Sequence, residues 1–391
     1  MPDSRDAVIV GGGIGGVSAA LALSHSADFE TIRVLERSDE FGEIGAGLQL
    51  APNAQHALEA LGIGAAELDR YAFRPGRLVM LDALSGEVIT ALDLGAEYER
   101  RYGKPYIVMH RRDLLDLLVD AAKQRANVEL CVGQTVSGVQ DEGTRAVART
   151  EQGVDHVADL VIGADGLRST VREQVVGDPA PVPSGYVSYR GTLPFDHVAE
   201  LAGGRDVLVW AGPGMHLVQY PIRRGELYNQ VVCFRSDRFD TGHSDWGLPD
   251  EIDEHYAEAC APVRASVELI SRDRHWKMVD RDPVENWVRG RLALLGDAAH
   301  PMFQYVAQGA CQALEDAQVL GSVLGAQPDI DAALVEYQRL RVPRAGRVQR
   351  TARSFGELLH LEGMGATVRN RLLEARAHDD YSESDWLHGH R

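Results

Sequence analysis

The feature that most constrains the fold is a glycine-rich turn after the first apolar run of the chain. Residues 6–10 read Asp-Ala-Val-Ile-Val, which is typical of a buried parallel strand. Residues 11–16 read Gly-Gly-Gly-Ile-Gly-Gly, and residues 14–26, rich in Ala and Leu, predict a helix. Residues 31–36 form a second β-branched, apolar run. The segment therefore predicts one βαβ unit.

Each glycine of the G-x-G-x-x-G motif has its own role in dinucleotide binding. Gly11 permits the tight turn, Gly13 lets the backbone approach a pyrophosphate, and Gly16 lets the helix pack closely on the strand. The helix N-terminus offers unpaired N–H groups and positive dipole to phosphates. Glu36, followed by Arg37, ends the second strand, where an acid accepts bonds from ribose hydroxyls. The unit predicts a dinucleotide and leaves NAD and FAD open.

Two later motifs favour FAD. Residues 160–166 predict a buried strand that ends in Asp165-Gly166, and residues 292–301 predict another that ends in Gly296-Asp297 at a helix start. An acid in the second place can accept a bond from a ribityl hydroxyl, while helix N–H groups point at a phosphate. A simple NAD-dependent dehydrogenase would leave both aspartates unexplained.

The remaining pattern predicts an α/β fold (α+β overall) with an inserted sheet. Strand-like runs at 127–140, 144–150, 156–162, 184–194, 206–211, 215–221 and 227–235 predict antiparallel strands. We expect a discontinuous Rossmann-like FAD-binding domain (1–75, 105–180 and 275–330), a substrate domain (76–104 and 181–274), a C-terminal helical region (331–376) broken at Pro343, and a polar tail (377–391) without predicted structure.

Composition excludes several classes of function. A formal net charge of -18 argues against a nucleic-acid partner, since phosphate binding needs a basic surface. The four cysteines lie singly without a C-x-x-C pair, so we expect no metal site and no disulfide framework. The N-terminus lacks a signal-peptide pattern and no apolar stretch reaches 18 residues. We expect a cytoplasmic protein with no stable membrane insertion.

With these motifs in order, the chain resembles the single-component, class A flavoprotein aromatic hydroxylases, which share the para-hydroxybenzoate hydroxylase fold. The resemblance covers nearly the whole chain. It implies that the first glycine motif binds the adenosine diphosphate of FAD, that Asp165-Gly166 serves FAD and NAD(P)H, and that Gly296-Asp297 holds the ribityl chain and pyrophosphate. The other cofactor-binding residues that it implies are Gly47 and Leu48 in the run 43–49, Arg111 (with Arg112 as the open alternative), Pro301, Gly309 and Ala310.

Two stretches, 212–221 and 296–317, resemble the 3-hydroxybenzoate 6-hydroxylases of this family. This narrower resemblance implies that His216, Tyr220 and Gln304 surround the phenol of the substrate. Met302, Phe303 and Gln308 depart from the expected pattern and leave the ring substituents open.

The residue types suit the implied chemistry. A phenol with a pKa of about 10 becomes a better nucleophile when its proton is withdrawn, and a histidine is the suitable base near neutral pH. His216 and Tyr220 are four residues apart on one strand and share a face. The alternative for His216 is a core histidine, and for Gln304 a helix-surface residue. Arg190 is a candidate for the substrate carboxylate, with a solvated arginine as its alternative.

The resemblance implies an FAD-dependent monooxygenase that uses NADH and O2 to convert 3-hydroxybenzoate to gentisate through a flavin C4a-hydroperoxide. A salicylate hydroxylase is the alternative within the family, and a non-catalytic flavin-binding redox sensor is the alternative from a different class. A flavin halogenase would need a Trp-x-Trp-x-Ile-Pro run, which the sequence lacks. The implied partners are a small aromatic carboxylate as substrate and a second copy of the chain in a homodimer.

Overall fold

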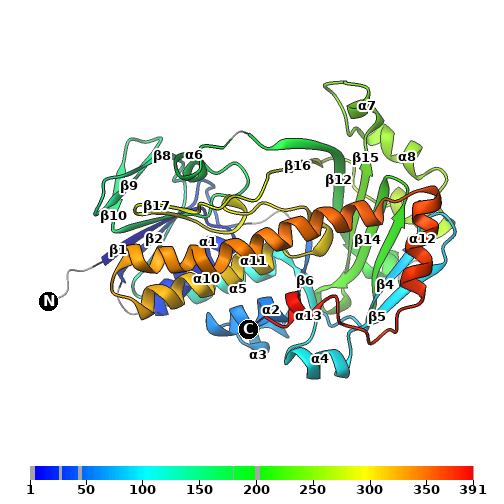
Figure 1. Ribbon diagram of the computed structural model, residues 1–391, viewed down its shortest axis with the longest axis horizontal. Helices are drawn as coiled ribbons and strands as arrows, with labels where there is room; N and C mark the ends of the chain where they lie inside the picture. The colour runs from blue at the N-terminus through cyan, green and yellow to red at the C-terminus, as the bar shows by residue number, and fades with distance from the viewer. Residues whose placement is uncertain (1–4, 26–28, 43–45, 179, 199–202, 391) are drawn as a thin grey trace.

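A mainly parallel sheet carries the N-terminal glycine motif (Figure 1). The computed structural model describes residues 5–25, 29–42, 46–178, 180–198 and 203–390. Within these ranges the strand order of this sheet is β17-β18-β11-β1-β2-β7, and β17 alone runs antiparallel to its neighbour. The strands are β1 (Arg5–Val10), β2 (Phe29–Leu35), β7 (Val128–Cys131), β11 (Leu160–Gly163), β17 (Val288–Arg289) and β18 (Leu292–Leu294).

Register brings the three motifs to one edge of this sheet. Val10 of β1 pairs with Gly163 of β11, which in turn pairs with Leu294 of β18. The glycine loop, Asp165 and Asp297 therefore follow neighbouring strand ends, where ligands bind in open α/β sheets.

Helices cover both faces of the parallel sheet. On one side lie α1 (Ile14–His25), α5 (Arg111–Lys123), α10 (Gly309–Ala326) and α11 (Ile330–Leu359), with α1 packed against α10 (Figure 1). On the other side lie α6 (Thr170–Val175) and an antiparallel sheet of β8 (Val136–Asp141), β9 (Ala146–Thr150) and β10 (Asp155–Ala158). The α/β architecture predicted from the sequence is confirmed.

A second large sheet contributes the other half of the candidate site. In the described part of the chain its strand order is β16-β12-β15-β14-β13-β4-β5. Its strands are β4 (Arg77–Asp82), β5 (Val88–Asp93), β12 (Val182–Pro194), β13 (Val207–Gly212), β14 (Met215–Ile222), β15 (Leu227–Arg235) and β16 (His275–Asp280).

The two faces of this second sheet have different surroundings because side chains alternate along each strand. One face buries Tyr189, Leu217 and Phe234 beneath α7 (Asp237–Asp240), α8 (Pro249–Tyr256) and α9 (Ala261–Glu268). The opposite face carries His216 and Tyr220; on this face Tyr220 packs against Gly47, and His216 packs against Tyr305.

Short elements connect the two halves. Strands β3 (Gly47–Leu50) and β6 (Ile107–His110) pair with each other beneath the second sheet. The remaining elements are α2 (Pro52–Ala60), α3 (Ala65–Leu68), α4 (Ala96–Tyr102), α12 (Gly363–Glu374), α13 (Asp385–His388) and the 3-10 turns η1 (Phe195–His197), η2 (Arg223–Gly225), η3 (Gly296–Ala298) and η4 (Gln304–Val306).

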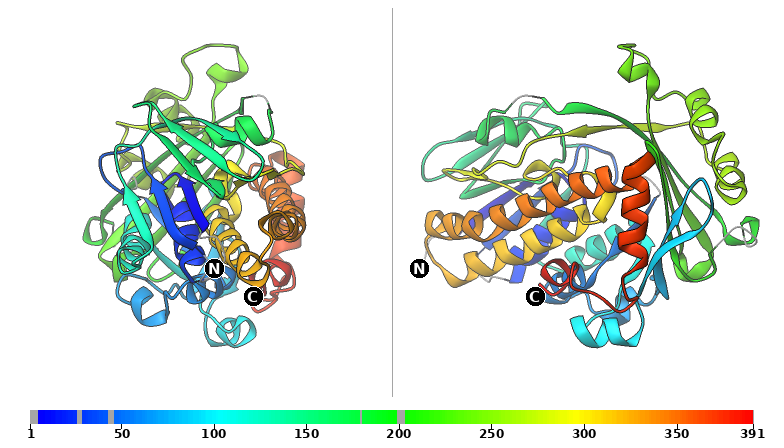
Figure 2. Two further views of the ribbon diagram at one scale, coloured as in Figure 1. Left: turned by 90° about the vertical axis from the view of Figure 1, so that its left-hand side faces the viewer. Right: turned by 45° about the vertical axis from the view of Figure 1, so that its right-hand side comes forward.

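The C-terminal part corrects two sequence predictions. Helix α11 runs unbroken through Pro343 (Figure 2), so the predicted break is wrong. A proline removes one helix hydrogen bond, but the buried ion pairs of Arg341 and Arg344 on either side hold the helix in place. The polar tail is also structured: Tyr381 and Leu387 are buried, and α13 packs against α2.

Three further properties follow from the described residues. All four cysteines are present as free thiols. No group of three or more His, Cys, Asp or Glu side chains in the described ranges is arranged to hold a metal ion. Among the described helices, none combines the length and the apolar character that a membrane span requires.

Candidate active site

The glycine motif forms a close-packed cradle at the end of β1. A Cβ on Gly16 would lie 1.9 Å from the carbonyl oxygen of Gly11, so α1 begins nearer to the strand than any side chain would permit. Gly11 itself has φ +106°, a conformation that favours glycine. Gly13 precedes the first turn of α1 and accepts from the N–H of Val17. The predicted roles of Gly11 and Gly16 agree with this geometry.

Glu36 reaches this cradle from the end of β2. Its carboxylate accepts from the backbone N–H of Gly12 at 2.8 Å and from that of Ser38 at 2.9 Å. The carboxylate is thereby fixed beside the glycine loop, where its remaining lone pairs can accept ribose hydroxyls. The neighbouring Arg37 is exposed.

Asp165 is half-buried, and its carboxylate has spare bonding capacity. Its Oδ2 accepts from the backbone N–H of Thr170 at 2.7 Å and from that of Val171 at 3.4 Å, whereas its buried Oδ1 has no partner. Burial is the largest influence on this group and raises the pKa of Asp165. Gly166 follows with φ +79°, so the chain turns sharply after the carboxylate. An unpaired buried oxygen fits a site that binds a polar ligand.

Asp297 lies exposed beside the start of α10. The place of a Cβ on Gly309 is 3.9 Å from Asp297 Oδ1, and no side chain caps the N-terminus of this helix, where Ala310 follows. Gly296 has φ +62°, and Pro301 is buried behind the turn. A carboxylate and uncapped N–H groups at one helix end fit the ribityl chain and phosphates of FAD.

The predicted flavin-ring loop meets the second sheet directly. Residues 43–45 of that loop lie outside the described residues, but Gly47 and Leu48 begin β3. The N–H of Gly47 donates to Asn229 Oδ1 at 2.6 Å, and a Cβ on Gly47 would lie 2.7 Å from Cε2 of Tyr220. The candidate cofactor loop therefore contacts the candidate substrate strand, and only a glycine fits between them.

Arg111, and not Arg112, lies beside the candidate site. Its backbone N–H donates to Ala46 O at 2.9 Å, and its charge acts on Arg190. Arg112 instead points to the carboxylates of Glu40 and Asp116, at 3.8 and 3.6 Å.

One face of the second sheet brings the three predicted substrate residues together. Cys233 of β15 pairs with both His216 of β14 and Ser188 of β12, so these side chains share a face. Gln304 in η4 donates from Nε2 to Ser188 Oγ at 3.5 Å. Gln304 is therefore half-buried against the sheet and is not the helix-surface residue that was its alternative.

His216 is sealed in the interior, with one ring nitrogen bonded. It is 1% exposed, and its Nδ1 lies 2.8 Å from Nε2 of His360. Its Nε2 makes no hydrogen bond to any described residue, although the edge of the ring contacts Tyr305. Burial, with the neighbouring His360, holds the pKa of His216 well below its usual range. A neutral imidazole with one free nitrogen can accept a proton from a ligand.

Tyr220 lies on the same face, nearer to β3. It is 3% exposed, and burial raises the pKa of its hydroxyl above the usual value, against the opposing effects of Arg190 and a hydrogen bond to Gln49. Gln49 also accepts from Tyr106 at 2.6 Å. The Tyr220 hydroxyl is thus a neutral hydrogen-bonding group.

Arg190 is a half-buried arginine without an ion-pair partner in the described part of the chain. Its Nε donates to Ser188 Oγ at 3.3 Å, and the guanidinium lies over Trp276, 5.3 Å from the ring centroid. Burial, followed by the charge of Arg111, lowers the pKa of Arg190. Buried charges are ordinarily paired, so this cation fits an anionic ligand.

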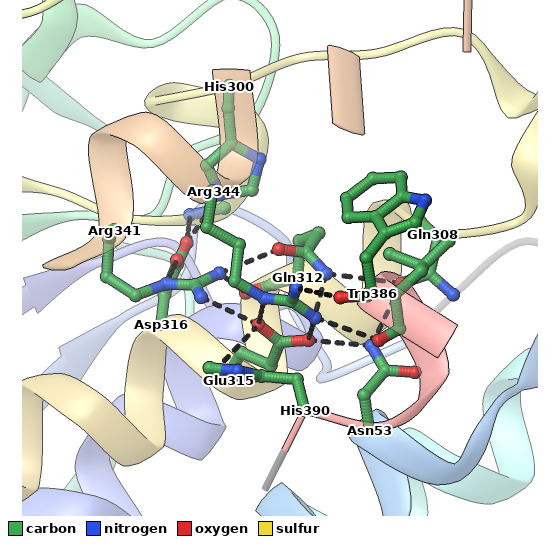
Figure 3. A network of polar contacts seen from close by, with 12 residues as sticks. Asn53, His300, Gln308, Gln312, Glu315, Asp316, Arg341, Arg344, Trp386 and His390 are labelled. Carbon is green, nitrogen blue, oxygen red and sulfur yellow. Dashed lines mark hydrogen bonds and ion pairs between the residues drawn. The ribbon is translucent and has the colours of Figure 1, made fainter. Parts of the chain in front are cut away.

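A network of buried ion pairs joins α10 to α11 (Figure 3). Arg341 donates to Glu315 and Asp316, each at 2.6 Å, and Asp316 also accepts from the N–H of Gly296 at 2.9 Å. His300, fully buried, bonds to Asp316 at 2.5 Å. His300 therefore belongs to the scaffold that supports the Gly296-Asp297 turn.

Gln308, one of the departures noted in the sequence, is part of this network. It is 1% exposed, and its Oε1 accepts from Asn53 at 2.9 Å and from Gln312 at 3.2 Å (Figure 3). Its identity is therefore explained by packing between α2 and α10, and it does not bear on the ring substituents.

Sequence reasoning missed Ser188, Asn229, Trp276 and His360. Ser188 and Asn229 lie on strands that were predicted, whereas Trp276 lies on β16, which was not, and the sheet register brings all three to the site. His360 is 144 residues from His216, and no local pattern links the two.

This geometry defines a flavoprotein: a glycine cradle, two carboxylates at strand ends and an uncapped helix fit FAD. Comparison of the whole chain with known proteins agrees. A model of the FAD binding domain family matches residues 4–352, and the chain belongs to this family of flavoprotein monooxygenases.

Individual relatives narrow the activity. The chain is 39% identical over 391 residues to the 3-hydroxybenzoate 6-hydroxylase of Polaromonas naphthalenivorans (strain CJ2). The aligned region covers 99% of this chain and 96% of that protein. The chain is 36% identical over 392 residues to the 3-amino-4-hydroxybenzoate 2-monooxygenase PtnB3 of Streptomyces platensis, with 97% and 95% covered. The solved structure of Klebsiella pneumoniae HpxO complexed with FAD and uric acid has a TM-score of 0.84 at 27% identity, with 98% and 96% covered. The chain is an FAD-dependent aromatic hydroxylase.

Proposed function

We propose that this enzyme hydroxylates 3-hydroxybenzoate at the carbon para to its hydroxyl, using NADH and O2, and yields gentisate, NAD⁺ and water. The observation that carries the proposal is the shared sheet face: an imidazole nitrogen of His216 on β14 and the guanidinium of Arg190 on β12, the two strands that flank β15, lie on it, and neither has a hydrogen-bond or ion-pair partner of opposite charge among the described residues. These are the groups that a ring with one phenol and one carboxylate requires. The relative at 39% identity carries the matching name.

FAD would be held by residues of the parallel-sheet half. Gly11, Gly13 and Gly16 would cradle the pyrophosphate, Glu36 the ribose, and Asp297 with the start of α10 the ribityl chain. Gly47 would lie near the ring system, because it touches Tyr220. When bound, FAD supplies the hydride acceptance and oxygen transfer that no side chain can perform.

The protein residues position the substrate and withdraw its proton. Arg190 holds the carboxylate, with Ser188 fixing the guanidinium from one side. His216 accepts the phenol proton at Nε2, which raises electron density at the positions ortho and para to the oxygen. Tyr220 and Gln304 orient the ring oxygen by hydrogen bonds. These roles are part of the proposal.

The oligomeric state belongs to the same proposal. We expect a homodimer, and its support is an apolar stripe on α12, where Met364, Val368 and Leu372 are 78%, 49% and 68% exposed at a spacing of four residues. Sedimentation velocity of the FAD-loaded protein measures this directly, and a monomer at micromolar concentration would remove this part of the proposal.

Substrate-stimulated turnover tests the function. Purified protein loaded with FAD is mixed with NADH and either 3-hydroxybenzoate, salicylate or 3-amino-4-hydroxybenzoate, while NADH oxidation and O2 uptake are followed and products are separated by chromatography. We expect strong stimulation and gentisate with 3-hydroxybenzoate. Strong stimulation by salicylate alone would assign the alternative activity, and FAD binding without stimulation by any phenol would indicate a redox sensor. Replacing NADH with NADPH tests the coenzyme preference.

A further inference from the structure

The free nitrogen of His216 lies in a sealed site, so a proton taken there needs a way out. The His216 side chain is buried on all sides, and its other nitrogen bonds to His360 at 2.8 Å. His360 directly follows α11 and is half-buried. It lines a groove of about 630 Å³ between the second sheet and α11, together with Tyr186, Arg235 and Glu357. The two imidazoles therefore connect the interior of the site with a solvent-accessible groove.

Energetics make such an exit necessary. A phenol has a pKa of about 10, whereas burial holds the pKa of His216 well below 6.5. A proton that stopped on His216 would leave a buried imidazolium beside a phenolate, several pKa units uphill. Transfer onward to water at neutral pH removes the buried imidazolium charge and leaves the phenolate in the site.

Resting on the function proposed above, we propose that His360 passes the phenol proton of the bound substrate from His216 to water in this groove. His360 is a positioning residue here, since it acts through His216 and does not touch the substrate.

The transfer balances atom by atom. Only one pair of tautomers leaves His216 Nε2 free to accept a proton from the phenol. In this pair, His216 Nδ1–H donates to His360 Nε2. The phenol O–H bond then breaks as an Nε2–H bond forms on His216. The Nδ1–H bond of His216 breaks as an Nε2–H bond forms on His360, and His360 releases its Nδ1 proton to water. The reverse transfers return a proton to the product oxygen and restore the starting state.

The groups that face His360 leave its second nitrogen available. Tyr186 from β12 stacks on the ring at 4.5 Å and 16°, and Tyr305 of η4 contacts it edge-on at 5.5 Å. Neither forms a hydrogen bond to the imidazole, and His360 Nδ1 bonds no described residue. Burial, followed by the charge of Arg369 on α12, lowers the pKa of His360 to about 4. A neutral imidazole of this kind passes a proton without keeping it.

Two arginines that line the groove form ion pairs with aspartates. Arg235 pairs with Asp240 at 2.6 Å, and Arg353 on α11 pairs with Asp280 of β16 at 2.8 Å. Glu357 of α11 also lines the groove. No described carboxylate lies within ion-pair distance of His360, so nothing fixes a proton on that ring.

Two variants separate proton transfer from simple support of His216. His360→Gln keeps an amide that can accept from His216 Nδ1 but cannot be protonated, and His360→Ala opens the groove to small bases. The control is Tyr305→Phe, which keeps the ring contact with both histidines. The probe is a nitro-substituted hydroxybenzoate whose phenolate absorbs visible light, mixed in a stopped-flow instrument with the oxidised, FAD-loaded enzyme.

We expect probe ionisation, and hydroxylation in parallel, to slow roughly 10-fold to 100-fold in His360→Gln while the substrate Kd changes little. In His360→Ala, added imidazole should restore the rate in proportion to its free-base fraction, so rescue rises with pH through the pKa of imidazole. Tyr305→Phe should match the wild type.

The relay is overturned if His360→Gln ionises the probe at the wild-type rate. It is also overturned if glutamine restores the rate that His360→Ala loses while added imidazole does not. Either result would leave His360 as a structural support for His216. A wild type that binds the probe without ionising it would overturn the relay as well. Failure of the proposed function is visible separately, in the products of the wild type.

Discussion

At the residue scale, Arg190 gives the most direct test of the proposed substrate site. We expect Arg190→Met to raise the Kd for 3-hydroxybenzoate about 10-fold to 100-fold, since a hydrogen bond to a charged group contributes about 1.5–3 kcal/mol. The thermal midpoint should stay unchanged or rise, because the substitution removes a half-buried charge that has no ion-pair partner among the described residues. Titration of flavin absorbance and differential scanning fluorimetry measure the two effects.

The control for Arg190 is Arg149→Met, an exposed arginine paired with Asp155 at 2.6 Å, which should leave the Kd unchanged. A lowered midpoint with an unchanged Kd for Arg190→Met would show that Arg190 serves folding and not the carboxylate.

His216 permits a second prediction at this scale. In His216→Ala we expect FAD and substrate to bind, hydroxylation to slow by about 10²–10⁴, and more of the consumed O2 to appear as H2O2. Single-turnover product analysis with a peroxide assay measures both. If product yield and rate equal those of the wild type, His216 is the core histidine that was its alternative.

At the scale of elements, we expect the ion pairs between α10 and α11 to contribute strongly to the free energy of unfolding. Arg341→Met should lower the free energy of unfolding by about 3–5 kcal/mol, because it leaves the buried Glu315 and Asp316 without their main cation. Arg339→Met on the same helix should cost less than about 1 kcal/mol, since its pair with Glu336 is exposed. Urea denaturation of both variants makes the comparison, and equal losses would contradict it.

The same network predicts how stability changes with pH. Burial by itself raises the pKa of Glu315 and of Asp316. Arg341 and the other groups that contact these carboxylates outweigh burial and lower both pKa values to about 2. Because the folded-state pKa values are depressed, this stabilisation is present above about pH 4.5 and is lost as the pH falls toward 2. Denaturation midpoints at pH 5.5 and pH 3 should differ more for the wild type than for Arg341→Met.

The elements also show where sequence reasoning succeeds. The βαβ unit and the strand-end aspartates were predictable because turn geometry and apolar runs are local signals. Pro343 and the tail were not, because distant contacts decide them: Arg344, buried against Glu315, also donates to the carbonyl oxygens of Trp386 and Leu387 at 3.0 Å. A tail with polar composition is thereby tied to the interior (Figure 3).

For the molecule as a whole, the two halves of the site are assembled by contacts that no local pattern encodes. The spacing of His216 and Tyr220 predicted a shared face, and the sheet register agrees. That Gly47 would meet Tyr220, or that His360 would meet His216, depends on how the parallel-sheet half packs on the second sheet. The roles of His216 and His360 stay predictions that the variants above test, and the domain boundaries stay predictions.

The alternation of side chains along β12, β14 and β15 has a practical consequence for engineering. Ser188, Arg190, Val218 and Tyr220 lie on the face that we propose holds the substrate, whereas Tyr189 and Leu217 point to the opposite face, into the core beneath α8 and α9. A combinatorial library randomised at every second position could therefore explore new aromatic substrates while the intervening positions keep the protein folded. The tolerance of such a library would depend on which face of the strand is varied, more than on how many positions are changed.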